Sequence, residues 1–358
     1  MLIARSPVRI SFGGGGTDLP AYYERFGGAV LSAAINKYFY TILGTRSDGR
    51  VQVISSDLRV FENWQDIADM PVQSSELEIP LAVLKNMGSK VSVDLFLASE
   101  IPPGTGLGSS ASVCVNILQA LGNYLHQPLS KYELAERAFH IARNVLGKHV
   151  GKQDEYAASF GGLNYISFHQ DGSAEVEALD LDPEMVHEFQ RNLMLFFTGS
   201  SHHSWTILRD QEDSTRAQSS TTLDALHEVK SLGFLMREAL QRGQLQGFGK
   251  LLHAAWEAKQ RVSSKISTPR IDQIYCCARD HGAIGGKITG AGGGGFLLLY
   301  CEKMYQEAVR VALRHEGVHE MAFAFDTQGA QVLVNDPFID SDEQGGARWT
   351  FVPAAVHL

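Results

Sequence analysis

The chain has 358 residues, of which 44% are hydrophobic and 20% are charged, a composition typical of a globular protein. Its length exceeds the usual size of one hydrophobic core, so we expect two lobes. Asp and Glu outnumber Lys and Arg by 40 to 31, and the net charge of −9 argues against broad binding to nucleic acid or to anionic membranes. A phosphate site must therefore be built locally, from backbone donors and a few cations.

Cysteine usage and hydropathy point to the compartment. None of the four cysteines forms a C-x-x-C pair, and the adjacent Cys276 and Cys277 would make a poor structural disulfide, so we expect reduced thiols. No signal peptide is visible, and the most apolar run, residues 295–301, is too short to span a bilayer. We expect a soluble, cytoplasmic protein without a membrane partner.

The first half of the chain alternates strand and helix signals. Runs rich in β-branched and aromatic residues predict strands at residues 8–12, 38–44, 51–55, 91–97 and 163–168. A helix that begins near Ser110 carries apolar residues along one face, and a second helix is predicted for residues 131–146. The acidic, loop-like sequence near residues 171–183 marks the expected boundary between the lobes.

The second half has the pattern of a small α+β lobe. Strands are predicted at residues 193–198, 296–301 and 321–325, and helices at residues 221–241, 245–262, 271–281 and 304–315. The order of elements predicts an α/β (α+β) fold with lobes at residues 1–172 and 173–334. Residues 335–358 read as an irregular tail.

The most informative segment is residues 102–111, a glycine-punctuated loop that leads directly into a helix. Gly104, Gly106 and Gly108 allow positive φ angles and a close approach of the backbone to a ligand. Free N–H groups at a helix N-terminus favour an anion, and the hydroxyls of Ser109 and Ser110 can bind phosphate oxygen or a divalent ion. A phosphate site is the favoured interpretation, and a glycine-rich turn with an ordinary serine N-cap is the alternative.

Two further glycine runs lie beside regular elements. One is Gly13–Gly16, followed by Thr17 and Asp18, and the other covers residues 285–295. The second contains a formal G-x-G-x-x-G match, but it precedes a strand instead of opening a helix, so it is no dinucleotide fingerprint. Ile288 after Lys287 also breaks the P-loop pattern.

Residues 151–162 combine glycine, cation, amide and acid. Asp154 could deprotonate a hydroxyl while Lys152 offsets the negative charge of phosphate, and a solvated charged turn is the alternative. The pair His202-His203 has no acid or cysteine at ligand spacing, so we favour an exposed loop pair over a metal site.

These motifs, in this order, resemble those of the GHMP small-molecule kinases. Residues 6–18 are similar to the first family motif, residues 102–111 to the ATP-phosphate loop and residues 287–295 to the third motif. Within the family, the match is with the bacterial D-glycero-D-manno-heptose 7-phosphate 1-kinases, which serve capsule and surface-polysaccharide synthesis. Fucokinase-type sugar kinases share much of the pattern and are the nearest alternative.

The resemblance implies a two-lobed GHMP-kinase fold with the active site between the lobes, and ATP and Mg²⁺ as cofactors. Asp154 matches the catalytic aspartate, the base toward the anomeric hydroxyl, while Lys152 and Arg9 are expected to stabilise charge near the transferred group. Ser110 is also expected at Mg²⁺. The residues expected at the ATP phosphates are Pro103, Gly104, Thr105, Gly106, Leu107, Gly108, Ser109, Ser110 and Ala111. The residues expected to bind or close over the sugar are Gly14, Gly15, Gly16, Thr17, Asp18, Gln153, Tyr156, Gly290, Ala291, Gly292 and Gly293.

Two departures from the family pattern stand out. Relatives carry a glutamate as magnesium ligand where this chain has Ala142. Either another acid, such as Glu136 or Glu155, or water completes the metal shell, or metal binding is weakened. Relatives also tend to have an arginine where this chain has Ser201-His202-His203. If these histidines help to read a sugar phosphate, affinity will vary with pH.

The expected activity is ATP-dependent phosphorylation of the C1 hydroxyl of a manno-heptose 7-phosphate. A kinase for an unphosphorylated sugar such as fucose is the alternative. A non-catalytic sensor is a third hypothesis, supported only by Ala142 and opposed by the presence of Asp154. Homodimer formation is left open, because the apolar stripes of the long helices are typical of a core as well as of a dimer interface.

Overall fold

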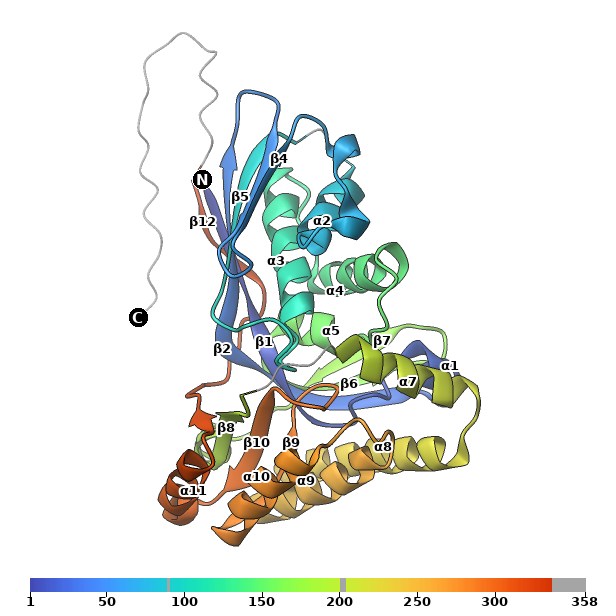
Figure 1. Cartoon of the computed structure of the whole chain (residues 1–358), viewed down its shortest axis with the longest axis vertical. Helices are drawn as coiled ribbons and strands as arrows, with labels where there is room; N and C mark the ends of the chain where they lie inside the picture. Colours follow the sequence, from blue (N-terminus) through green and yellow to red (C-terminus); the bar gives the residue numbers. More distant parts are fainter. Residues whose placement is uncertain (89–90, 200–203, 337–358) are drawn as a thin grey trace.

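The computed structural model describes residues 1–88, 91–199 and 204–336, which form two sheets surrounded by helices (Figure 1). The larger sheet has the order β12-β1-β2-β5-β3-β4, with β6 paired to β2 and β7 paired to β6. Its strands are β1 (Leu2–Gly13), β2 (Gly28–Thr45), β3 (Val51–Ser55), β4 (Val60–Trp64), β5 (Val93–Ser99), β6 (Leu163–Phe168), β7 (Ala174–Ala178) and β12 (Gln331–Asn335).

The smaller sheet has the order β11-β8-β10-β9 and lies below the first in Figure 1. Its strands are β8 (Leu193–Phe197), β9 (Ala283–Ile288), β10 (Phe296–Cys301) and β11 (His319–Glu320). The α-helices are α1 (Pro20–Phe26), α2 (Glu78–Met87), α3 (Ser109–Tyr124), α4 (Lys131–His140), α5 (Gln153–Phe160), α6 (Pro183–Arg191), α7 (Ser204–Arg216), α8 (Ser220–Gln241), α9 (Leu245–Gln260), α10 (Pro269–Asp280) and α11 (Lys303–His315).

The long strands β1 and β2 form the centre of the molecule. The first part of β2 pairs with β6 and the last part with β5, so β2 joins two branches of the larger sheet. Helices α3 and α5 contact one side of the β1–β2 pair, while α8 and α9 approach from the other. Because helices cover both faces, the middle of this pair is buried almost without interruption.

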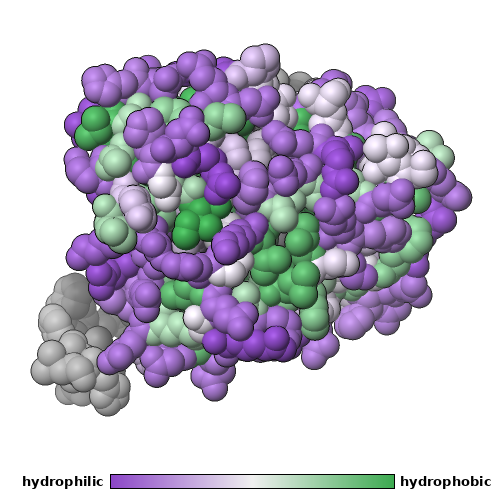
Figure 2. Space-filling model, turned by 90° about the horizontal axis from the view of Figure 1, so that it is seen from below, coloured by the Kyte–Doolittle hydropathy of each residue, from purple (hydrophilic) through white to green (hydrophobic). Residues whose placement is uncertain are grey.

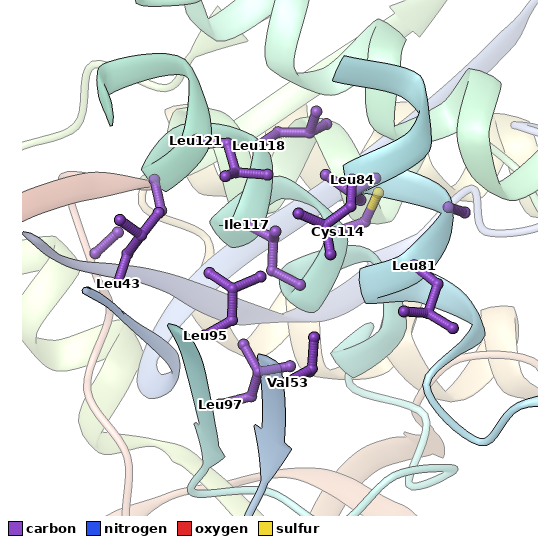
Figure 3. Packing of buried hydrophobic residues seen from close by; sticks show 14 of the residues in the cluster. Leu43, Val53, Leu81, Leu84, Leu95, Leu97, Cys114, Ile117, Leu118 and Leu121 are labelled. Carbon is purple, nitrogen blue, oxygen red and sulfur yellow. The ribbon is translucent and has the colours of Figure 1, made fainter. Parts of the chain in front are cut away.

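The core of the larger sheet lies between its strands and the helices α2 and α3. Leu43, Leu95 and Leu97 point from the strands toward Ile117 and Leu121 of α3 (Figure 3). All five side chains are buried, and the i, i+4 spacing of the two α3 residues places them on one face. This packing fixes α3, and therefore the loop that precedes it, against the sheet.

Several predicted strands match the structure residue for residue, namely 51–55, 163–168 and 296–301. The predicted strand at 321–325 is wrong: only His319–Glu320 forms a strand, and Phe325 makes a single bridge to Ile35. The reason is that this segment leaves one sheet for the other. The amide of Met321 donates to the carbonyl of Leu195 in β8, whereas the carbonyl of Ala324 accepts from the amide of Asn36 in β2.

Other boundaries also differ from the predictions. The helix expected at 131–146 ends as an α-helix at His140 and continues as a π-helical turn, Ile141–Val145. Asn335, expected in the irregular tail, ends β12 and pairs with Leu2. The residues from 337 onward and the pair His202-His203 lie outside the described residues, and the domain boundary at 172/173 stays a prediction.

The face around α8–α10 carries apolar areas interrupted by hydrophilic side chains (Figure 2). Phe234 and Leu235 of α8 are among the exposed large apolar side chains. Homodimer formation remains a prediction. Within the described ranges, every helix is too short or too polar to cross a membrane.

Candidate active site

The segments singled out in the sequence meet around a cavity of about 400 Å³. The lining comes from the loop before α3, the π-helical turn after α4, the 13–18 turn, the start of α5, and helices α7 and α9. The predicted residues that line the cavity are Arg9, Gly16, Asp18, Gly104, Gly106, Gly108, Ser109, Ser110, Ala111, Gln153, Asp154, Gly290 and Ala291.

The loop before α3 has the geometry expected of an anion cradle. Gly104, Gly106 and Gly108 have φ angles of 74°, 80° and 79°, in the region that favours glycine. Gly108 is itself the N-cap of α3, and the helix has no side-chain cap bond. The serine N-cap alternative is therefore excluded, and Ser109 and Ser110 keep their hydroxyls for another partner.

The third glycine run packs backbone to backbone against this loop. A Cβ at Gly106 would lie 2.5 Å from the carbonyl oxygen of Thr289, and one at Gly290 would lie 2.7 Å from that of Gly106. A Cβ at Gly295 would lie 2.2 Å from the carbonyl oxygen of Thr105. Side chains at these positions would push the loop away, so the run is glycine-rich to hold the loop closely.

Asp154, in the first turn of α5, lies directly beside the loop. Its Oδ1 accepts from Arg9 Nε at 2.7 Å and lies 2.6 Å from Arg9 Nη2, while Arg9 Nη1 donates to the carbonyl of Gly106 at 2.6 Å. The other oxygen, Oδ2, lies 3.2 Å from the point where a Cβ of Gly108 would stand. The Arg9 side chain is buried, whereas that of Asp154 is 27% exposed and open to a ligand.

Asp18, from the 13–18 turn, is a further polar residue of the cavity lining. Its Oδ1 accepts from the Gly16 amide at 2.8 Å and from Gln153 Nε2 at 3.2 Å, and its Oδ2 accepts from the Gln153 amide at 3.3 Å. A Cβ at Gly151 would lie 2.0 Å from Asp18 Oδ2, so glycine is required there. Burial, and after it the charge of Asp154, raises the pKa of Asp18.

Two buried lysines donate hydrogen bonds to the backbone at and just before the 13–18 turn. Lys259 Nζ donates to the carbonyl of Gly15 at 2.9 Å, and Lys287 Nζ to that of Phe12 at 3.4 Å. Burial lowers the pKa of Lys259 to about 8, with Asp18 opposing the shift. Burial, and then the charge of Lys259, lowers the pKa of Lys287 to about 7. Two basic side chains therefore lie beside the cavity, and within the described residues neither forms an ion pair with a carboxylate.

Some predicted residues lie away from the cavity. Lys152 Nζ bonds both oxygens of Glu136 and the carbonyl of Gly172, so its position does not agree with charge stabilisation at the transferred group. The Tyr156 hydroxyl also donates to Glu136. Pro103, Thr105, Leu107, Gly14, Gly15, Thr17, Gly292 and Gly293 are likewise absent from the cavity lining.

Most of these residues have a supporting position instead. Thr17 Oγ1 donates to the carbonyls of Gly14 and Ala29 and ties the 13–18 turn to β2. The amide of Gly293 donates to Ile266. The residues that do line the cavity lie around one common space, and the roles predicted for them stay predictions.

The candidate carboxylates for a metal differ in position. Glu136 accepts hydrogen bonds from Lys152 and Tyr156, whereas Glu155 lines the cavity and its Oε2 has no hydrogen-bond partner. Burial, and then the charge of Asp154, raises the pKa of Glu155 well above its usual range. Among the residues that the structure covers, no three or more His, Cys, Asp or Glu side chains form a ready metal cluster.

The sequence predictions missed α7 and Lys259. Trp205 and Leu208 of α7 line the cavity, and Glu212 of the same helix accepts hydrogen bonds from Arg143 and His149. Lys259 follows the buried Leu252, Ala255 and Trp256 at helical spacing. The signal in the sequence was a lysine in line with buried apolar residues of a helix. Because burial of an unpaired charge is costly, such a lysine points to a functional site.

Comparison with known protein families gives two matches. Residues 78–162 match the GHMP kinases N terminal domain, and residues 236–319 match the GHMP kinases C terminal domain. The first match contains the α3 loop and Asp154, and the second contains Lys259 and the third glycine run.

Individual proteins agree with these matches. The D-glycero-alpha-D-manno-heptose 7-phosphate kinase of Campylobacter jejuni is 30% identical over 332 residues, which cover 91% of this chain and 97% of that protein. The L-fucokinase/L-fucose-1-P guanylyltransferase of Bacteroides fragilis is 28% identical over 86% of this chain, but the match covers only 35% of that protein.

Among solved structures, a D-glycero-D-manno-heptose 1-phosphate kinase from Bacteroides thetaiotaomicron has a TM-score of 0.79 and 27% identity, with 94% of this chain and 100% of that chain covered. A Lactococcus lactis galactokinase with galactose has a TM-score of 0.74 at 19% identity, covering 92% of this chain and 94% of its own. The latter likeness concerns the fold alone.

Proposed function

The chain belongs to the GHMP kinases and is a sugar kinase that uses ATP, and we propose that its acceptor is the anomeric C1 hydroxyl of D-glycero-D-manno-heptose 7-phosphate. The product is then the 1,7-bisphosphate, a precursor for nucleotide-activated heptose and for capsule or surface polysaccharide. The similarity to the Campylobacter heptose 7-phosphate kinase along nearly the whole of both chains supports this acceptor.

The observation that carries the proposal is that Asp154 lies beside the loop before α3, in a cavity that Asp18 also lines. One carboxylate oxygen is held by Arg9, and the other is beside Gly108 of the phosphate loop. A hydroxyl that approaches from the side of Asp18 therefore meets a carboxylate next to the γ-phosphate. Phosphoryl transfer depends chiefly on such positioning and on neutralisation of charge.

The proposed division of roles follows from this arrangement. The backbone N–H groups of the loop and the N-terminus of α3 hold the phosphates, with the hydroxyls of Ser109 and Ser110 as further donors. Asp154 accepts or orients the hydroxyl proton. Arg9 keeps that carboxylate in place and contributes positive charge, while Asp18 and Gln153 bind sugar hydroxyls.

The charge stored behind the 13–18 turn supports a phosphorylated acceptor. Lys259 lines the cavity, and its one hydrogen bond to a described residue goes from the ammonium to the carbonyl of Gly15. We propose that Lys259 interacts with the sugar phosphate or with the hydroxyls next to it. An ammonium is a strong donor to phosphate, and such charge-assisted bonds are stronger than neutral ones.

Mg²⁺ fits the cavity residues next to the phosphate loop. It usually keeps several waters and binds one or two carboxylates together with the phosphates of the substrate, so a ready cluster of three acids is not required. The Ser110 hydroxyl and the Asp154 carboxylate are available there. When bound, Mg²⁺ neutralises charge on the β- and γ-phosphates.

A kinase for an unphosphorylated sugar is the second candidate, favoured by the similarity to the Bacteroides fucokinase domain. Membership of a kinase family and the Arg9–Asp154 pair count against a non-catalytic sensor. Incubation with ATP, Mg²⁺ and heptose 7-phosphate, followed by ³¹P NMR, tests the proposed position. We expect a new anomeric phosphate signal beside the retained 7-phosphate, whereas phosphate on another hydroxyl would contradict the C1 assignment.

A further inference from the structure

Glu155 is a buried carboxylate that the proposed division of roles does not use. It lies in the first turn of α5, next to Asp154, and its residue is 2% exposed. It nevertheless lines the cavity, and its Oε2 has no hydrogen-bond partner. It takes part in no ion pair within the described part of the chain.

Among the residues that the structure describes, no cation donates a hydrogen bond to this carboxylate. Arg9, the cation that acts on it, directs its donors to Asp154 and to the carbonyl of Gly106. Lys152, three residues earlier, is bonded to Glu136 and to the carbonyl of Gly172. A buried charge without a partner is costly, and it is normally paired or bound to a metal.

Glu155 lies near the part of the cavity where phosphate is expected. Ser110 and Cys114 are one helical turn apart on α3, and both line the cavity. The Cys114 thiol is buried, and Glu155 acts on it electrostatically. Glu155 therefore lies near the first turns of the helix whose N-terminus receives the phosphates.

Neither Glu136 nor Ala142 can serve as the carboxylate ligand in place of Glu155. Glu136 is absent from the cavity lining and is already bonded to Lys152 and Tyr156. Ala142 lines the same cavity from the π-helical turn but offers only a methyl group. A divalent cation held between nucleotide phosphate and the Glu155 carboxylate would give the unpartnered Oε2 a partner.

We infer that Glu155 is a carboxylate ligand of the divalent cation that accompanies ATP, in the place where Ala142 provides none. The inference rests on the proposed function only for the presence of a metal–nucleotide complex. It does not depend on the acceptor sugar.

Mn²⁺ binding provides a readout other than activity. Free Mn²⁺ is followed by electron paramagnetic resonance during titration of the protein with a non-hydrolysable ATP analogue present and no sugar added. For Glu155→Gln we expect Mn²⁺ affinity to fall about tenfold or more, the scale of losses at metal sites. Adding Ala142→Glu to this variant is expected to recover affinity, because residue 142 lines the same cavity.

Two controls separate metal binding from a structural role. Glu136→Gln removes a nearby carboxylate outside the cavity and is expected to leave Mn²⁺ affinity within about twofold of wild type. The melting temperature of the ligand-free Glu155→Gln protein is expected to equal or exceed that of wild type, because the substitution removes a buried carboxyl whose oxygen has no partner.

Equal Mn²⁺ affinity for wild type and Glu155→Gln would overturn the assignment of Glu155. If Glu155→Gln does not fold, Glu155→Asp keeps the charge but shortens the side chain, and its Mn²⁺ affinity is judged by the same criterion. Failure of heptose phosphorylation with normal Mn²⁺ binding would contradict the proposed acceptor while leaving Glu155 as a ligand.

Discussion

Arg9 holds Asp154 by two nitrogens on a single oxygen: Nε and Nη2 lie 2.7 and 2.6 Å from Oδ1. The third guanidinium nitrogen donates to the carbonyl of Gly106 in the phosphate loop. The Asp154 carboxylate and the loop are thus positioned by the same buried side chain of β1. The second oxygen of Asp154 remains available to the acceptor hydroxyl.

Replacement of Asp154 by Asn should remove the proton acceptor while keeping the shape of the side chain. We expect kcat to fall about 10²–10⁴-fold, the usual contribution of a general base. Nucleotide affinity, measured with a fluorescent ATP analogue, should change little, because the loop and α3 hold the phosphates. Turnover within a few-fold of wild type would show that Asp154 is not the base.

Gly151→Ala tests the position of Asp18. A Cβ at residue 151 would lie 2.0 Å from Asp18 Oδ2, so the carboxylate must move. We expect a rise in the KM of the acceptor and a loss of about 1–3 kcal/mol in the free energy of unfolding.

Gly247→Ala is the matched control for this variant, because the new Cβ would make only an ordinary contact at 3.6 Å with Gln244. Since residue 247 lies inside α9, alanine there should stabilise the protein by up to about 1 kcal/mol. Similar kinetics for the two alanine variants would argue against a binding role for Asp18.

The affinity for the phosphorylated acceptor should depend on the charge of Lys259. Burial lowers its pKa to about 8, so the ammonium loses its proton, and the acceptor KM should rise, as the pH increases through 8. Lys259→Met should raise the acceptor KM about tenfold at pH 7, the value of one charged hydrogen bond, and should abolish this step.

Lys287, with a pKa of about 7, and Asp18 and Arg9 are the charged neighbours of Lys259. In Lys287→Met the step in KM near pH 8 should therefore persist. Steady-state kinetics between pH 6 and 9.5 decide the matter, and an unchanged step in Lys259→Met would exclude Lys259 as its origin.

Glu212 should stabilise the position of α7 over the cavity. It is fully buried and accepts from Arg143, His149 and Arg216. Burial opposes ionisation, but these bonds, that from Arg143 first, lower its pKa to about 2. Because the folded-state pKa is lowered, the stabilisation is present above the ordinary value of about 4.5 and is lost as the pH falls toward 2.

Glu212→Gln should therefore lower the free energy of unfolding at pH 7 by up to about 3 kcal/mol and reduce its dependence on acid. Denaturant unfolding at pH 7 and pH 3 measures both effects. Wild-type stability in Glu212→Gln at pH 7 would contradict the stabilising role. The control Glu184→Gln alters an acid near the start of α6, far from this network in the sequence.

Elements that bury apolar side chains could be predicted from the sequence. Elements that bury polar side chains could not. Residues 163–168 and 296–301 are rich in aromatic and aliphatic side chains and are buried on both faces. Helix α7 instead buries Gln211, Glu212 and Thr215, so hydrophobic periodicity cannot reveal it. The segment 321–325 reads as a strand but connects two sheets, which local sequence does not indicate.

In the candidate site, too, some features could be predicted from the sequence and others could not. Gly104, Gly106 and Gly108 were predicted to adopt positive φ angles, and all three do. That Lys152 turns toward Glu136 while Lys259, 107 residues later, reaches the cavity depends on tertiary packing. Sequence motifs therefore identified Arg9 as a cation of the site, whereas Lys259 was found only in the structure.

The acceptor specificity is the central claim, and kcat/KM for ATP-dependent ADP release across a sugar panel tests it most directly. The panel contains D-glycero-D-manno-heptose 7-phosphate, the same heptose without phosphate, and L-fucose. We predict a preference for the 7-phosphate of about 100-fold or more over the unphosphorylated heptose, the value of one or two charged hydrogen bonds. Equal or higher kcat/KM for L-fucose or for the unphosphorylated heptose would contradict the account.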